Sequence, residues 1–106
     1  MTVTYTNLYP RDAEFNEDYY MNTHMAQATK LLGPHALVSW ELFRFTEGAP
    51  YAVEIAVTWA SVEARLAALA TEEGKRMAGD VVNFSKKKPI VMLREPGGSG
   101  PANNRG

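Results

Sequence analysis

The sequence predicts a single α+β domain whose strands and helices follow one another in the order βαββαβ. Four β-rich segments, at residues 3–9, 37–46, 51–59 and 89–95, are separated by two segments in which apolar residues recur at the helical period. A turn signal at residues 47–50 joins the second and third strands into a hairpin. With 106 residues and no internal repeat, the chain has room for one domain. The order is that of the ferredoxin-like fold, a four-stranded antiparallel sheet with two helices on one face.

The first helix is predicted over residues 15–32. Asn16 is a good N-cap, and Phe15 and Tyr20 occupy the positions of a hydrophobic staple. Gly33, followed directly by proline, is expected to end the helix as the C′ residue. We therefore expect one uninterrupted α-helix in this region.

The second helix is predicted over residues 61–77, with a serine as its N-cap. Gly74 weakens this helix, so a kink or break is expected near it. Residues 79–88 are expected to form a loop or a short helical turn. The domain then comprises residues 1–95, and the Gly-, Pro- and Asn-rich tail at 96–106 has nothing to bury and should be mobile.

The third strand predicts a partner for the far face of the sheet. One side of this strand is large and apolar, and the other side is small and mixed, consisting of Ala52, Glu54, Ala56 and Thr58. Such a face is neither a full core face nor a charged solvent face. We expect it to meet the same face of a second copy, which would give a homodimer with a closed barrel between the sheets.

The composition excludes several classes of function. The net charge of −1 lacks the basic excess expected of a nucleic-acid-binding protein. The chain has no cysteine, hence no disulfide, thiolate nucleophile or sulfur metal site. No apolar run approaches the roughly 20 residues that span a bilayer, and no signal peptide is visible. We expect a cytoplasmic protein with no membrane or nucleic-acid partner.

A histidine lies within the apolar face of the first predicted helix. At about 100° per residue, one sector roughly 140° wide collects Tyr20, Met21, His24, Met25, Ala28, Leu31 and Leu32. An imidazole in that position is either a core group bonded to a backbone carbonyl or the acid/base group of a buried pocket. The ordinary pKa of histidine lies near 6.5, which suits it to proton transfer. The residues alone leave both interpretations open.

The same helix carries a resemblance to a known family. Residues 15–25, FNEDYYMNTHM, and residues 31–34, LLGP, resemble the first-helix signature of the EthD family. Residues 79–84, GDVVNF, resemble the segment before that family's last strand. In that signature a proline usually follows the His-Met pair, whereas Ala26 stands there here. The resemblance covers residues 1 to about 95 and implies the dimeric α+β barrel fold.

The resemblance also implies a range of activities. EthD proteins are associated with breakdown of ethyl tert-butyl ether, and other members of the superfamily include cofactor-free cyclases, decarboxylases, isomerases, monooxygenases and haem-degrading enzymes. The predicted second helix holds no histidine that could bind haem. No phosphate loop and no cluster with metal-ligand spacing is visible. We therefore expect no metal and no cofactor.

The candidate catalytic residues are His24 as acid or base and Tyr20, one turn earlier, as an oxyanion donor. The candidate substrate-binding residues are Asn7, Tyr5, Met21, Ala28, Trp40, Tyr51, Trp59, Asn83 and Phe84. Each also has a structural interpretation: a staple for Tyr20, a strand end for Asn7, and core or dimer interface for the aromatic residues. Asp80 is expected in the same loop as Asn83, whereas Arg65 is expected on a solvated helix face.

Three functions are compatible with these residues. The first is cofactor-free proton transfer (cyclisation, dehydration, isomerisation or decarboxylation) on a small hydrophobic, aromatic or carbonyl-bearing metabolite. The second is a cofactor-independent monooxygenase, or an accessory to oxidation of an ether or aromatic compound. The third is a dimer that binds such a metabolite without catalysis.

Overall fold

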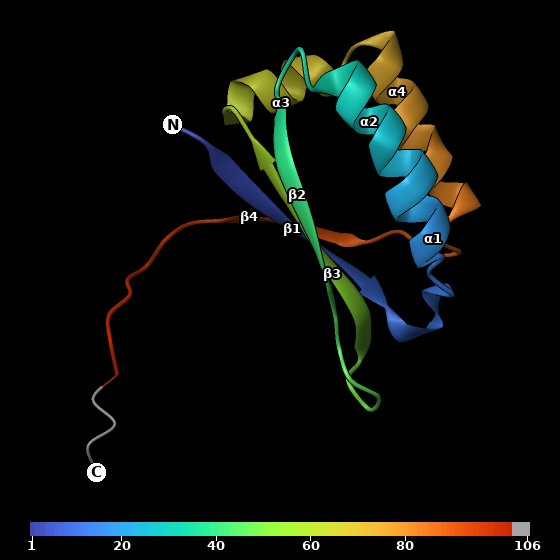
Figure 1. The fold of residues 1–106 in the computed structure, drawn as a ribbon, viewed down its shortest axis with the longest axis vertical. Helices are drawn as coiled ribbons and strands as arrows, with labels where there is room; N and C mark the ends of the chain where they lie inside the picture. The colour runs from blue at the N-terminus through green and yellow to red at the C-terminus, as the bar shows by residue number, and fades with distance from the viewer. Residues whose placement is uncertain (103–106) are drawn as a thin grey trace.

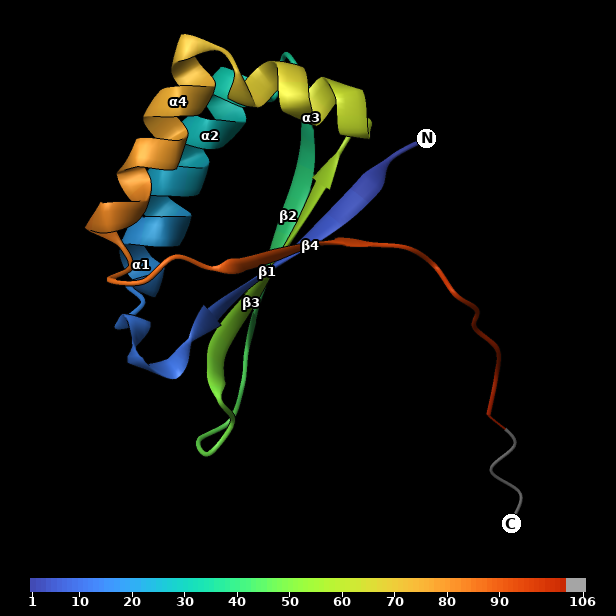
Figure 2. The same cartoon turned by 180° about the vertical axis from the view of Figure 1, so that it is seen from behind.

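The sheet has four antiparallel strands in the order β2-β3-β1-β4, and every α-helix lies on one side of it (Figures 1 and 2). This computed structural model describes residues 1–102. The elements are β1 (Val3–Pro10), α1 (Glu17–Tyr19), α2 (Met25–Leu32), β2 (Leu37–Arg44), β3 (Tyr51–Trp59), α3 (Val62–Leu69), α4 (Glu72–Gly79) and β4 (Ile90–Arg94). The predicted α+β, ferredoxin-like class is confirmed.

The strand boundaries agree with the sequence to within about two residues. β3 spans the predicted range, while β2 ends at Arg44 instead of residue 46. Arg11 bridges the hairpin end, because its guanidinium donates to the carbonyls of Thr46 at 2.8 Å and of Tyr51 at 2.9 Å. The carbonyl of Thr46, which lies beyond the end of β2, thus accepts a hydrogen bond from the Arg11 side chain.

The first helical segment is not the uniform α-helix that was expected. A π-helical turn, Tyr20–His24, separates α1 from α2, and the backbone N–H of Met25 donates to the Tyr20 carbonyl. The wider turn brings Tyr20, His24 and Met25 inward together, while Met21 is only half-buried. π-turns of this kind occur frequently at functional sites.

The end of this helix also differs from the expectation. Gly33 has a φ of −55°, which is right-handed, so it closes the last turn as the C-cap and is not a left-handed C′ residue. A Cβ on Gly33 would lie against the Thr29 carbonyl oxygen, which gives a steric reason for glycine at this position.

The second predicted helix is two helices, with a break at residues 70–71. Ser61 caps α3, as predicted, because its Oγ accepts from the Ala64 N–H at 2.9 Å. Thr71 caps α4 by accepting from the Gly74 N–H at 3.0 Å. The break therefore precedes Gly74, which lies inside α4 where a Cβ would stand 2.6 Å from Leu69 Cα. Gly74 thus permits close approach of α4 to the end of α3.

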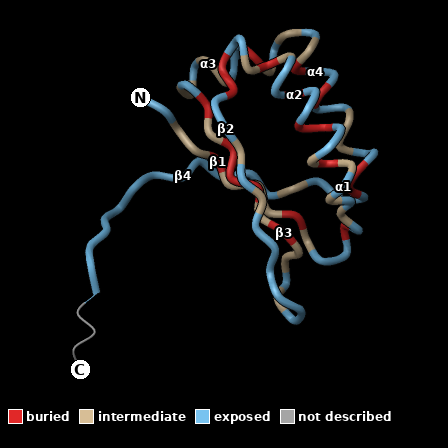
Figure 3. The backbone as a smooth tube through the Cα atoms, in the orientation of Figure 1, coloured by how far each residue is buried: buried red, intermediate tan, exposed pale blue. Residues whose placement is uncertain are grey.

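Buried residues gather between the helices and the facing side of the sheet (Figure 3). Ile55 and Val53 on β3 form the centre, with 0% and 2% of their surface exposed. Residues 96–102 leave the sheet on the side away from the helices, with no helix or strand (Figure 1). The remainder of the predicted tail, residues 103–106, lies outside the described part of the chain. Across residues 1–102, none of the helices combines the length and the apolar character needed to traverse a bilayer.

Candidate functional site

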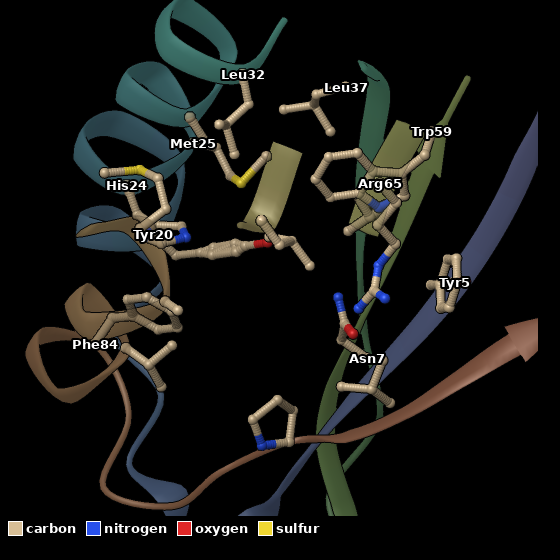
Figure 4. Close-up of a pocket in the computed structure, with 18 of the residues that line it drawn as sticks. Tyr5, Asn7, Tyr20, His24, Met25, Leu32, Leu37, Trp59, Arg65 and Phe84 are labelled. Atoms are coloured by element: carbon tan, nitrogen blue, oxygen red, sulfur yellow. The ribbon is translucent and has the colours of Figure 1, made fainter. Parts of the chain in front are cut away.

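A cavity of about 240 Å³ lies between the helices and the inner face of the sheet (Figure 4). Its walls are mostly apolar side chains from β1, β3, α2 and α4. The polar side chains that reach it include Tyr20, His24, Asn7 and Arg65. Apolar cavities with a few convergent polar groups are typical of small-molecule sites.

The π-turn positions both predicted catalytic residues, Tyr20 and His24. Tyr20 opens the turn and His24 closes it, and both are buried, with 3% and 9% of their surface exposed. Their rings are 5.3 Å apart, and the Phe84 ring lies 4.6 Å from the His24 ring. Phe84 therefore packs against both the Tyr20 ring and the imidazole of His24.

Asp80 binds the imidazole of His24. The distance from His24 Nδ1 to Asp80 Oδ2 is 2.9 Å, and the two side chains are 11% and 15% exposed. An ionised carboxylate can only accept, so it fixes the proton of a neutral imidazole on Nδ1. Nε2 is then the unprotonated nitrogen, available to a ligand as a base.

Two further donors hold the Asp80 carboxylate. The Tyr19 hydroxyl donates to Asp80 Oδ1 at 2.8 Å, and the Asn83 amide donates to the same oxygen at 2.8 Å. Burial raises the pKa of Asp80, but the hydrogen bonds from Asn83, His24 and Tyr19 outweigh it, and the pKa lies below its ordinary value. The hydrogen bond to Asp80 raises the pKa of Tyr19, which keeps its proton and remains a donor.

Tyr20 presents a protonated phenol to the cavity. Burial, with a smaller contribution from Tyr9, raises the pKa of Tyr20. Figure 4 shows its hydroxyl extending from the helix into the space before the sheet. A protonated phenol in an apolar setting is a suitable hydrogen-bond donor to a developing oxyanion.

The structure brings seven of the eleven predicted site residues to this cavity. Tyr5, Asn7, Tyr20, His24, Ala28, Trp59 and Phe84 all line it. Met21, Trp40, Tyr51 and Asn83 do not.

Each of the four has a physical reason for its position. The π-turn moves Met21 toward the edge of the helix face. Trp40 packs beside Tyr20 with ring centres 6.1 Å apart, and Tyr51 lies at the hairpin end, where its carbonyl accepts from Arg11. Asn83 is exposed and donates to Asp80 instead of facing a ligand.

Two residues at the site were not assigned their roles from the sequence. Asp80 lies 56 residues after His24, and only the packing of the helices brings them together. The weak resemblance of residues 79–84 to a family segment was the one available signal. Arg65 was expected on a solvated helix face, but it lines the cavity with its guanidinium carbon 4.0 Å from the Tyr5 ring centre.

The part of the chain that the structure describes contains no convergence of three His, Asp or Glu side chains that could hold a metal ion. Within residues 1–102, His24 and Asp80 form a pair with no third His, Asp or Glu side chain that could complete a metal site.

The comparisons with known proteins identify the fold. No family model and no curated protein matches the chain. An EthD-like protein of Ralstonia eutropha superposes with a TM-score of 0.73 and 24% identity over 89% of this chain and 90% of that one. An EthD family protein of Bacillus halodurans gives 0.69 and 23%, covering 91% and 99%. SnoaB of Streptomyces nogalater, described as a cofactor-independent oxygenase, gives 0.66 and 16%, covering 95% and 98%. The predicted EthD resemblance is thus confirmed as a shared fold.

Proposed function

We propose that this protein is a cofactor-free enzyme that transfers protons on a small aromatic or carbonyl-bearing metabolite. The observation that carries the proposal is the 2.9 Å contact between His24 Nδ1 and Asp80 at the wall of an apolar cavity. A core histidine needs only one hydrogen-bond partner. Here two donors, Tyr19 and Asn83, fix the carboxylate of Asp80, and the carboxylate in turn orients the His24 ring toward one tautomer.

The chemistry follows from that tautomer. Nε2 of His24 takes a proton from a carbon next to a carbonyl, so that the C–H bond breaks and an N–H bond forms. The electron pair moves to the carbonyl oxygen, where the Tyr20 hydroxyl donates to the resulting enolate. The imidazolium, stabilised by Asp80, then returns the proton to a different atom or to a departing hydroxyl. The first outcome is an isomerisation and the second is a dehydration that releases water.

The volume of the cavity indicates how large a ligand it can hold. An engineered cavity of about 150 Å³ in another protein holds benzene, so a volume of about 240 Å³ corresponds to roughly ten heavy atoms. A substituted single ring fits this volume. The aromatic residues around the cavity, Tyr20, Phe84 and Trp59, suit a flat ligand.

A second candidate is a cofactor-independent monooxygenase acting on an electron-rich phenol. The aromatic wall favours it, and SnoaB, with the same fold, is described as an oxygenase of this kind. In this reaction His24 would deprotonate the phenol to make it oxidisable by dioxygen. Oxygen consumption accompanies turnover in this case and not in the first.

We also propose that the protein acts as a homodimer formed through the outer face of the sheet. At the centre of this face the carboxylate of Glu54 has its hydrogen-bond partners within the same subunit, because it accepts from Thr6 at 2.8 Å and from Arg94 at 2.9 Å. Phe43 on β2 and Met92 on β4 flank it, each with 46% of its surface exposed. A self-complementary face with apolar flanks and a neutralised centre suits a second copy of the same face.

The enzyme proposal is tested by screening small aromatic ketones, keto acids and phenols for product by mass spectrometry, with an oxygen electrode in parallel. Turnover should occur, and His24→Asn should reduce it at least about 100-fold. His35→Asn, which changes the other histidine, should leave turnover unchanged. Product without oxygen uptake supports proton transfer, and product with stoichiometric uptake supports the monooxygenase. Saturable binding without any product, or a fully active His24→Asn variant, contradicts catalysis by His24.

A further inference from the structure

The two ends of the cavity carry different polar side chains (Figure 4). His24, Tyr20 and Phe84 lie together at the helix end, while Arg65 and Asn7 project into the space near the sheet. The proposed proton transfer uses only the first group. The second group has no part in that chemistry and needs a separate explanation.

Arg65 is a cation without a carboxylate partner within residues 1–102. None of the ion pairs there includes it, and no Asp or Glu lines the cavity. Its guanidinium lies over the Tyr5 ring at 4.0 Å and near the Trp59 ring at 5.9 Å. The two rings lie against the guanidinium, and its N–H donors have no side-chain acceptor in this part of the chain.

Asn7 is the second unengaged polar group. It lies on β1 between Tyr5 and Tyr9, and its side chain makes no hydrogen bond within the described residues, although it lines the cavity. An amide beside a guanidinium adds a neutral donor to a charged one. Planar donors in this combination match a carboxylate.

We infer that Arg65 and Asn7 form an anion subsite, and that the substrate is a small aromatic or otherwise planar acid. Its carboxylate binds Arg65 and Asn7 at the sheet end, and its carbonyl or phenol group reaches His24 and Tyr20 at the helix end. This inference rests on the proposed function for the identity of the reacting end. The anion subsite itself depends only on Arg65 and Asn7.

The test compares benzoate with benzamide, which have the same shape and the same number of heavy atoms, about nine each, and therefore match the volume of the cavity. Dissociation constants are measured at pH 7 by titration of ¹⁵N-labelled protein, following backbone amide shifts. The wild-type protein should bind benzoate about tenfold more tightly than benzamide. The shifts should map to residues that line the cavity.

Arg65→Met should abolish this preference, so that both probes bind with the affinity of benzamide. Arg65→Lys keeps the charge without the planar fork and should retain part of the preference. Arg76→Met removes an exposed arginine of α4 that does not line the cavity, and it should preserve the full preference. His24→Asn should also preserve it, which separates a failure of the anion subsite from a failure of the catalytic proposal.

Several results would overturn the inference. The wild-type protein could bind the two probes with equal affinity, or bind neither of them saturably. Arg65→Met could keep the full preference for benzoate over benzamide, or the backbone amide shifts could be confined to the outer face of the sheet. The wild-type comparison alone decides the matter if Arg65→Met does not fold.

Discussion

Replacing the Asp80 carboxylate by an amide should reverse the tautomer of His24. The carboxylate accepts from Tyr19 and Asn83 through Oδ1 and from His24 Nδ1 through Oδ2. In Asp80→Asn a single carbonyl oxygen remains, and two donors already converge on the Oδ1 position. The amide nitrogen therefore faces His24, so that Nδ1 must accept and the ring proton moves to Nε2. The nitrogen that should act as the base then carries a proton.

The size of the effect follows from the charge that is lost. The Asp80 side chain is only 15% exposed, so its bond to His24 is shielded from solvent. Hydrogen bonds to charged groups contribute about 1.5–3 kcal/mol and neutral ones about 0.5–1.5 kcal/mol, so replacing the charge-assisted bond to His24 by a neutral one should lower the unfolding free energy by about 1–1.5 kcal/mol. Turnover should fall by about 10²–10⁴-fold, the range for loss of a correctly protonated base.

The stability difference should also depend on pH. The pKa of Asp80 in the folded protein lies below its ordinary value, so the ionised carboxylate stabilises the fold at pH values above its unfolded pKa of about 3.9. That stability is lost as the pH falls through the depressed folded pKa. The part of the stability difference between wild type and Asp80→Asn that comes from the Asp80 charge should therefore disappear as the pH falls below about 4.

The assay is two-bond ¹H–¹⁵N correlation of the histidine rings, combined with thermal unfolding. Wild-type His24, in its neutral form, should carry its proton on Nδ1, and Asp80→Asn should carry it on Nε2. Asp12→Asn removes an exposed carboxylate that pairs with Lys87 at 2.8 Å, and it should leave the His24 signals unchanged. A wild-type ring protonated on Nε2, or the same tautomer in both proteins, would refute this reasoning.

Three further predictions concern packing, assembly and catalysis. Gly74→Ala should lower the unfolding free energy by about 1–3 kcal/mol in chemical denaturation, because its Cβ would meet the end of α3. Gly79→Ala should not destabilise the protein, because no atom lies within 4 Å of the added Cβ. Equal effects of the two substitutions would show that the close approach at Gly74 is unimportant. Met92→Glu on the outer face of the sheet should convert the proposed dimer to a monomer of 11.7 kDa in sedimentation analysis. Leu66→Glu on the exposed side of α3 should leave the dimer intact. A wild-type protein that sediments as a monomer would contradict the proposed interface. Tyr20→Phe should reduce turnover about 10²–10³-fold with an unchanged melting profile, and full activity would remove Tyr20 as an oxyanion donor.

The sequence predicted the order and class of the elements because their signals are local. Alternation in β3, the Asn16 and Ser61 caps and the Phe15–Tyr20 staple each act within a few residues, and all four occur in the structure. The sequence did not predict the π-turn, because one extra residue in a helical turn has no distinctive composition.

The site was only partly predictable, for a related reason. His24 and Tyr20 were selected because they lie in an apolar helix face. Asp80 contacts His24, and Arg65 lines the cavity, only through tertiary packing. The sequence pattern of a polar helix face is the same whether that face meets solvent or a cavity. Met21 was selected because it lies in the predicted apolar helix face and Trp40 because it is a large aromatic residue, and the π-turn and the packing beside Tyr20 keep them from the cavity.

The central claim, that His24 held by Asp80 moves protons in the cavity, is tested most directly by hydrogen exchange on the substrate. A compound that the protein turns over is incubated with it in D₂O, and deuterium at the carbon next to the carbonyl is followed by mass spectrometry. The wild-type protein should incorporate deuterium at least about 100-fold faster than His24→Asn. Equal rates in the two proteins, with binding intact, would contradict the claim.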